Sequence, residues 1–209
     1  QKPPKCYNIG RNERVVFIVQ VLKDELRHKI LLEAQHLFLQ RGYARTSLQM
    51  IADKVNISKS NLYHYFKSKE DLFYELTDGA AEGLKKLILR LRDKRFNPRT
   101  GQREYQVLLT EEVLSLLLAE KYGLLLILEQ AQGTRYESLR PGMIDMLAAK
   151  IAPLLADEDN CVLLAQIMAQ NLLDGIVLIL KNRVRPREVR INLNRLVEYH
   201  TKGMDALLK

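Results

Sequence analysis

The sequence predicts an all-α protein of about nine helices. Apolar residues make up 47% of the 209 residues, whereas there are only 10 glycines and 6 prolines. This composition can build a core and favours helices over a turn-rich β sandwich. From Leu22 onward, apolar residues recur every three to four positions, which is the helical period. Capping and breaking residues separate the periodic stretches.

Residues 1–21 are expected to form an N-terminal extension, either native or added for expression. Basic residues precede the apolar run Val15–Val19, as in a signal peptide, but Lys23-Asp24-Glu25 occupies the place of a small-residue cleavage site. A basic arm that reaches DNA is the alternative. Cys6 and Cys161 lie too far apart to indicate a disulfide framework or metal cluster. With no apolar run of about 18 residues, we expect a cytoplasmic protein and no membrane contact.

Three helices are expected between residues 22 and 67. The first has one apolar face and ends at Gly42, which is suited to a position just past a helix. The second begins with Thr46 and Gln49, spaced as a capping box. Its apolar stripe has the spacing i, i+3, i+4 and i+7. The residues on the two apolar faces are Leu26, Ile30, Ala34, Leu37 and Phe38, then Leu48, Ile51, Ala52 and Val55.

The third helix is predicted to start at Ser58, because Asn56 tolerates a left-handed turn and serine is a strong N-cap. Leu62 and Phe66 are i, i+4 partners and should point inward. Two short helices joined by such a turn form a helix-turn-helix unit. Residues 41–69 contain six basic residues and one acid, which suits a phosphate-lined groove. A solvated helix face is the plain alternative, and spacing alone does not decide between them.

A longer residue string adds to this pattern. It comprises Ala34, Leu37-Phe38, Gly42-Tyr43, Thr46, Ile51-Ala52, Ile57-Ser58-Lys59, Leu62-Tyr63-His64-Tyr65-Phe66 and Lys69-Glu70-Asp71-Leu72-Phe73. Over roughly residues 22–76 it resembles the tetracycline-repressor (TetR/AcrR-like) family of bacterial transcriptional regulators. Asn56 departs from that family's usual glycine, but asparagine also accepts positive φ, so the turn should survive.

The resemblance implies a recognition helix beginning at Ser58 that lies in the DNA major groove. Lys59 and Asn61 would read bases, since lysine suits guanine and asparagine suits adenine. Tyr63, His64 and Tyr65 match positions that contact phosphates and thymine methyls in that family. The full set of candidate DNA-binding residues is Ser47, Gln49, Ser58, Lys59, Ser60, Asn61, Tyr63, His64, Tyr65, Lys67 and Lys69.

Residues 68–209 are expected to form a ligand-binding and dimerisation domain. A long helix from Ser68 to Arg95 would join it to the head, followed by helices at about 102–121, 122–132, 135–155, 157–182 and 187–208. Met143, Met146, Gln166, Gln170 and Asp174 are candidates for lining a small-molecule cavity, although the polar stripe could instead face solvent or a partner subunit. Candidate dimer contacts are Leu172, Gly175, Ile176, Ile179, Leu193, Leu196, Val197 and Met204.

The resemblance implies a regulator, most simply a repressor, that binds a palindromic operator on double-stranded DNA as a homodimer. An unidentified small apolar or amphipathic effector would release it. No cofactor, metal site or catalytic residue is expected, because no phosphate loop, nucleophile elbow or i, i+4 histidine pair is present. A helical protein-binding adaptor and a catalytic offshoot that uses the apolar cavity remain the alternatives.

Overall fold

The computed structural model describes residues 11–93, 111–155, 160–182 and 185–207. Within these residues the chain forms nine α-helices, one 3₁₀ helix and no strand, which confirms the all-α prediction. The helices are α1 (Arg11–Arg41), α2 (Leu48–Val55), α3 (Lys59–Tyr63), α4 (Lys69–Asp93), α6 (Glu111–Ala119), α7 (Lys121–Glu129), α8 (Leu139–Ile151), η2 (Ala152–Leu155), α9 (Cys161–Lys181) and α10 (Pro186–Leu207).

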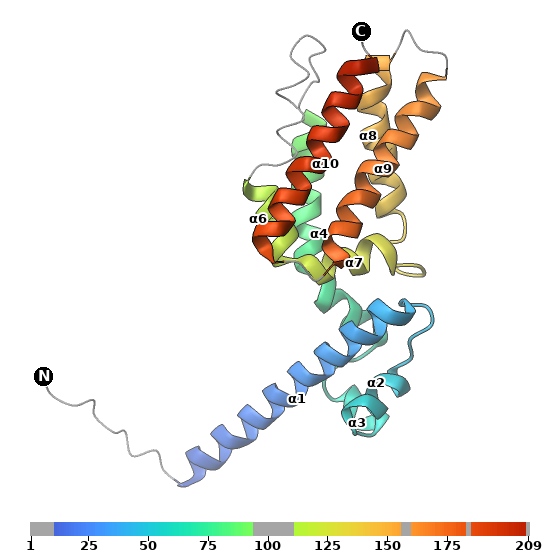
Figure 1. Cartoon of the computed structure of the whole chain (residues 1–209). Helices are drawn as coiled ribbons and strands as arrows, with labels where there is room; N and C mark the ends of the chain where they lie inside the picture. Colours follow the sequence, from blue (N-terminus) through green and yellow to red (C-terminus); the bar gives the residue numbers. More distant parts are fainter. Residues whose placement is uncertain (1–10, 94–110, 156–159, 183–184, 208–209) are drawn as a thin grey trace, which may run out of the picture.

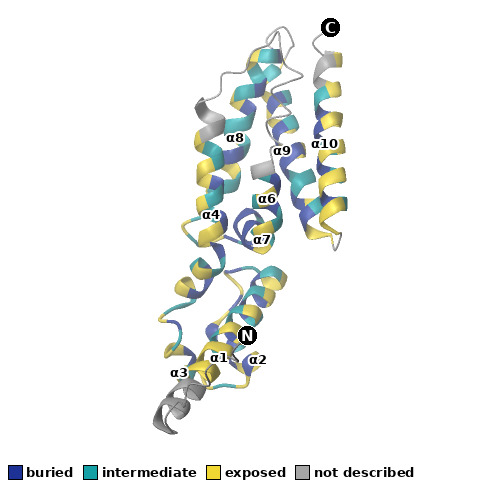
Figure 2. Cartoon of the chain, turned by 90° about the vertical axis from the view of Figure 1, so that its left-hand side faces the viewer, coloured by how far each residue is buried: buried dark blue, intermediate teal, exposed yellow. Residues whose placement is uncertain are grey.

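The helices form a small N-terminal head and a larger helical body (Figure 1). The head contains α1, α2, α3 and the first turns of α4, while the body contains the rest of α4 and α6 to α10. Burial follows this division, since the head has one apolar cluster and the body has two. Helix α4 runs through both parts (Figure 2). It therefore connects the two parts without a break.

Helix α1 is longer than the sequence predicted. It begins at Arg11 and not near Leu22, so it continues without a break across the expected end of the extension. Its N-terminal half projects past the rest of the head (Figure 1). The adjacent apolar residues Val15–Val19 have no helical period, which is why the pattern gave no signal there, although none of them breaks a helix. Gly42, with φ of +81°, ends α1 as expected.

The predicted capping box at the start of α2 is wrong by one residue. Ser47 is the N-cap, and its hydroxyl accepts a hydrogen bond from the Met50 amide at 3.2 Å. Thr46 is buried instead, and its hydroxyl donates to the Gly42 carbonyl at 2.8 Å. Gln49 donates to Asp53. The carbonyl left unpaired where α1 ends therefore competes successfully for the threonine hydroxyl.

The turn between α2 and α3 has the predicted geometry. Asn56 adopts the left-handed conformation with φ of 62°, and its amide donates back to the end of α2. The Ser58 hydroxyl accepts from the Asn61 amide at 3.1 Å and so caps α3. Leu62 and Phe66 are buried as predicted. Ser68 caps α4 in the same way, accepting from the Asp71 amide.

Helix α9 is the most apolar long helix that the structure describes. Among the described residues, it is the one helix long and apolar enough, by length and composition, to cross a membrane. It packs against α8 and α10 in the body, and Gln166 and Gln170 interrupt its exposed side. A helix that contributes to an internal core can have this composition, so length and hydropathy alone are weak evidence for a membrane span.

Replacing Asn56 by alanine should destabilise the head by about 1–2 kcal/mol, because alanine resists the left-handed conformation. Replacement by glycine is the matched control and should change the free energy of unfolding by only about 0.5 kcal/mol, since glycine adopts this conformation freely. Urea denaturation of the three proteins measures both changes. Equal losses in the two variants would show that the asparagine side chain, and not the backbone conformation, matters at this turn.

Candidate nucleic-acid interface

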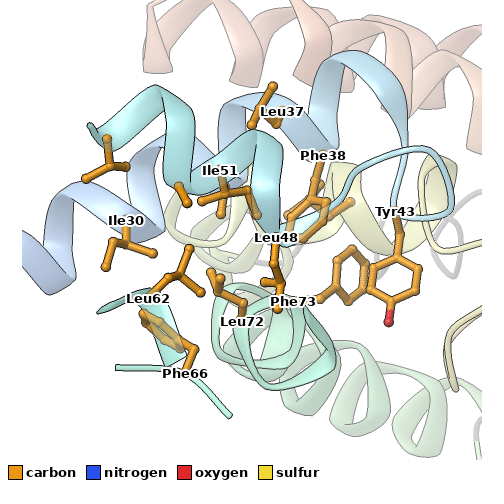
Figure 3. Close-up of a cluster of buried hydrophobic side chains, with 14 of the residues drawn as sticks. Ile30, Leu37, Phe38, Tyr43, Leu48, Ile51, Leu62, Phe66, Leu72 and Phe73 are labelled. Carbon is orange, nitrogen blue, oxygen red and sulfur yellow. The ribbon is translucent and has the colours of Figure 1, made fainter. Parts of the chain in front are cut away.

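A compact apolar cluster holds the helix-turn-helix unit together. The side chains of Ile30, Ile51, Leu62 and Leu72 come from four different helices and meet inside the head (Figure 3). Each of them is fully buried. Helix α3 has only five residues, too few to be stable by itself. Its position therefore depends on Leu62 and on Phe66, which follows it.

The outer face of α3 presents the residues that the sequence singled out. Lys59, Ser60, Tyr63 and His64 are exposed. Tyr63 has a relative solvent-accessible surface of 46%, which is large for an aromatic residue. The Lys59 ammonium lies 5.9 Å from the centre of the Tyr63 ring. This arrangement places a cation and an aromatic side chain together on a rigid, solvent-facing surface.

The remaining candidates surround this face. Asn61 and Tyr65 are half-buried at its margins, as predicted, and Tyr65 packs partly against the head cluster. Lys67 is exposed. The hydroxyls of Ser47 and Ser58 accept hydrogen bonds from amides of their own helices. These two serines thus place the helix N-termini, which are suited to phosphate.

Lys69 was predicted to contact DNA as a phosphate anchor, but its ammonium is already bound within the head. Its ammonium donates to the carbonyls of Tyr43 at 2.9 Å and Thr46 at 3.0 Å. It also lies 4.0 Å from the centre of the Tyr43 ring. Burial lowers the pKa of Lys69, with an opposing effect from Glu70, and mainly burial raises the pKa of Tyr43 to about 12. Lys69 is therefore a structural cation that joins the α1–α2 loop to the start of α4.

The residues predicted to line a ligand cavity do not come together. Met143 is buried in the body core, while Gln166 and Gln170 are exposed on α9. Asp174 is paired with Arg140, and Met146 is half-buried. The structure instead has a groove of about 640 Å³ on another side of the body. Its walls are formed by Asp78, Ala81, Glu82, Lys85, Ile88, Leu89, Arg135, Tyr136 and Leu139.

Most of the predicted dimer contacts are used inside one chain. Leu172, Leu193 and Val197 are buried in the body clusters. Leu196 packs against Gly175, where an added Cβ would lie 2.8 Å from the leucine side chain. Ile176 and Ile179 are partly buried against the same clusters, and the side chain of Met204 lies outside the described residues.

Other apolar side chains on α9 and α10 are exposed. Leu163, Ile167 and Leu178 follow one side of α9, and Ile191 and Tyr199 are exposed on α10. The spacing of these α9 residues is helical, so it was available in the sequence. It was missed because α9 is apolar on nearly all sides, and the pattern does not tell which side its own chain covers.

Comparison with known proteins agrees with this geometry. Residues 30–76 match the family described as "Bacterial regulatory proteins, tetR family". Over these residues the head of this chain is similar to the tetR family. The matched range runs from α1 into α4 and includes the whole helix-turn-helix unit.

Individual relatives match over the same part of the chain. An uncharacterized HTH-type transcriptional regulator, YuxN of Bacillus subtilis, is 37% identical over 89 residues, which is 42% of this chain and 31% of the relative. The HTH-type transcriptional regulator QacR of Staphylococcus aureus is 45% identical over 51 residues, or 24% of this chain and 27% of the relative. The chain thus covers about a third of the length of these relatives.

The fold likeness extends further than the sequence likeness. A TetR family transcriptional regulator from Chloroflexus aurantiacus has a TM-score of 0.52 with this chain at 15% sequence identity. The alignment covers 88% of this chain and 92% of the other. The helical body that follows the head therefore shares the all-α architecture of that protein.

Lys67 and Lys69, close together at and before the start of α4, should differ in their effect on stability. Lys69→Met removes the ammonium that holds two carbonyls and should lower the free energy of unfolding by about 1–2 kcal/mol. Lys67→Met, at an exposed position, is the control and should change stability by only about 0.5 kcal/mol. Chemical denaturation measures both. Equal stability of the two variants would contradict the structural role of Lys69.

Proposed function

We propose that this protein is a sequence-specific DNA-binding transcriptional regulator of the bacterial cytoplasm. The observation that carries the proposal is the tetR-family helix-turn-helix with Lys59, Tyr63 and His64 presented on the outer face of α3. Buried Leu62 and Phe66 hold that face rigidly. The head's excess of basic residues supplies the charge that DNA binding requires.

The polar groups of α3 are suited to different parts of the duplex. The Lys59 ammonium suits guanine O6 and N7 in the major groove, whereas Lys67 and the N-terminus of α2 suit phosphates. Asn61 has the amide that pairs with adenine. In this proposal α3 lies in the major groove, and the packing of Leu62 inside the head sets its depth.

We propose a repressor that acts as a homodimer and is released by a small molecule. Two-fold symmetry would place two α3 helices about 34 Å apart, one turn of DNA. The relative IcaR of Staphylococcus aureus is named a negative regulator, whereas FasR of Mycolicibacterium smegmatis is named an activator. Repression is the simpler mode, because a dimer bound at an operator blocks access without any further contact.

The dimer surface in this proposal is the exposed side of α9 with adjoining parts of α10. Six of the twelve large exposed apolar residues in the described chain lie on these two helices. Such concentration on neighbouring helices is typical of an association surface. This surface replaces the dimer contacts predicted from the sequence, because most of those residues pack within one chain.

Selection of bound sequences from random DNA tests the function. We expect a palindromic site, with affinity falling steeply as salt rises because lysines and arginines displace counterions. Lys59→Ala should weaken specific binding by about 1–3 kcal/mol and relax the preference at one base of each half-site. An adaptor that binds protein would show no selected sequence.

Lys86→Ala is the matched control for this experiment, since Lys86 is an exposed lysine on α4 outside the head. Its binding should equal that of the unmodified protein. If Lys59→Ala weakened specific and random DNA equally, α3 would contact only phosphates and the base-reading role of Lys59 would be refuted.

Ile167→Glu should convert the dimer to a folded monomer, because it places charge in the proposed α9 surface. Sedimentation velocity measures the mass, and far-ultraviolet circular dichroism checks the helix content. Leu32→Glu, at a similarly exposed position on α1, is the control and should remain dimeric. A monomeric unmodified protein, or an Ile167→Glu protein that stays dimeric, would contradict the proposed surface.

A further inference from the structure

The groove along α4 is lined in part by Arg135, whose guanidinium lies among aromatic and acidic side chains. Arg135 lies in the α7–α8 loop, and its guanidinium carbon lies 3.8 Å from the centre of the Tyr74 ring and 4.8 Å from that of Tyr136. Its Nη2 donates to Asp78 Oδ1 at 2.8 Å and to the Tyr136 hydroxyl at 2.6 Å. The Tyr136 hydroxyl donates to the same Asp78 oxygen at 3.0 Å. We call Tyr74, Tyr136 and Asp78 the cation box.

The ion pair between Arg135 and Asp78 holds the arginine in the cation box, and exchanging it costs little free energy. The side chains of Arg135 and Asp78 remain 54% and 61% exposed, so water screens their ion pair. Exposed pairs of this kind contribute only a small stabilisation. Arg135 also belongs to a loop that contains Gly133 in a left-handed conformation, with φ of +80°. The Arg135 side chain can therefore be exchanged for another cation at a small cost.

The rest of the groove suits an apolar arm. Ile88, Leu89 and Leu139 line it, and its volume lies within the range of small-molecule sites. Glu82 adds a second carboxylate, paired at 3.7 Å with Lys86, and Lys85 lies in the lining as well. An anion would have to approach both carboxylates, and the Arg135 guanidinium is already engaged by Asp78 and close to both rings.

We propose that this groove binds an amphipathic organic cation with a planar amidinium or guanidinium group, which takes the place of Arg135 in the cation box. The groups that recognise such a cation are already those that hold the arginine: ring faces for cation–π contact and a carboxylate for the N–H groups. This inference rests on the proposed function for its regulatory consequence and not for the binding itself.

The groove is connected to the DNA-binding head by two routes. Gln130, at the start of the α7–α8 loop, accepts a hydrogen bond from the Tyr43 amide at 3.1 Å, and the next residue, Ala131, is buried in the head cluster. Through α4, Tyr74 packs against Phe73, which lies in the same cluster. Release of Arg135 thus changes a loop and a ring that both contact the head. Cation binding should shift the head away from its DNA-binding orientation.

Calorimetric titration without DNA tests the site. The probes are 4-butylbenzamidinium and its anionic counterpart 4-butylbenzoate, which match in size and shape. We expect the unmodified protein to bind the amidinium and not the benzoate. Arg135→Ala should tighten amidinium binding by roughly three- to fivefold, because an exposed competing ion pair is removed. In the Arg135→Ala background, Asp78→Asn should then weaken it again.

Arg185→Ala is the matched control, since Arg185 also pairs with a carboxylate at 2.8 Å and is exposed, but lies next to α10. Its amidinium affinity should equal that of the unmodified protein. Three outcomes overturn the proposal: no binding of either probe, tighter binding of the benzoate, or amidinium binding that is unchanged or weakened by Arg135→Ala. The sign of the Arg135→Ala effect separates a cation site from an anion site.

The regulatory part is measured on the selected DNA site. Saturating 4-butylbenzamidinium should weaken DNA binding by a factor in the usual range of about 5 to 150, and DNA should weaken amidinium binding by the same factor. Equal DNA affinity with and without the probe overturns this coupling. Failure of the proposed function would appear differently, as an amidinium titration that succeeds in a protein that selects no DNA.

Discussion

The packing around Tyr43 joins the head to α4 and to the helical body. Its ring contacts those of Phe38 in α1 and Phe73 in α4, with centroid distances of 5.8 and 5.0 Å, and these two rings also contact each other. The Lys69 ammonium donates to the Tyr43 carbonyl and to that of Thr46. The Tyr43 amide donates to the carbonyl of Gln130 in the body. One residue thus joins the end of α1, the start of α4 and the end of α7. A domain of about fifty residues has little core of its own, so such external contacts are needed.

Much of this head could be predicted from the sequence because its signals are local. The caps at Ser58 and Ser68, the turn at Asn56 and the inward positions of Leu62 and Phe66 depend on neighbours within a few residues. The role of Lys69 could not be predicted, because its partners lie 26 and 23 residues away. A lysine in a basic segment has the same pattern whether it faces phosphate or a carbonyl. The choice between Thr46 and Ser47 as N-cap likewise depended on a carbonyl at the end of another helix.

In the body, the apolar pattern predicted where the helices lie along the chain but not which side of each helix is buried. Helix α9 is apolar nearly all round, so periodicity could not separate the side that packs on α8 from the side left exposed. The sequence made Gln166 and Gln170 candidates for a cavity wall, but both lie on the exposed side of the helix. The groove on α4 has a mixed lining from two distant segments, and no single stretch of sequence indicates it.

The two routes from the groove to the head have a common physical basis in the aromatic side chains. Phe38, Tyr43, Phe73, Tyr74 and Tyr136 form a continuous series of ring contacts from the centre of the head to the wall of the groove. Densely packed rings change position by discrete steps and not by gradual deformation. The last ring, Tyr136, also donates a hydrogen bond to Asp78, so its orientation depends on what neutralises that carboxylate. In our proposal, exchange of this exposed ion pair therefore acts through the series of rings on the core that supports α3.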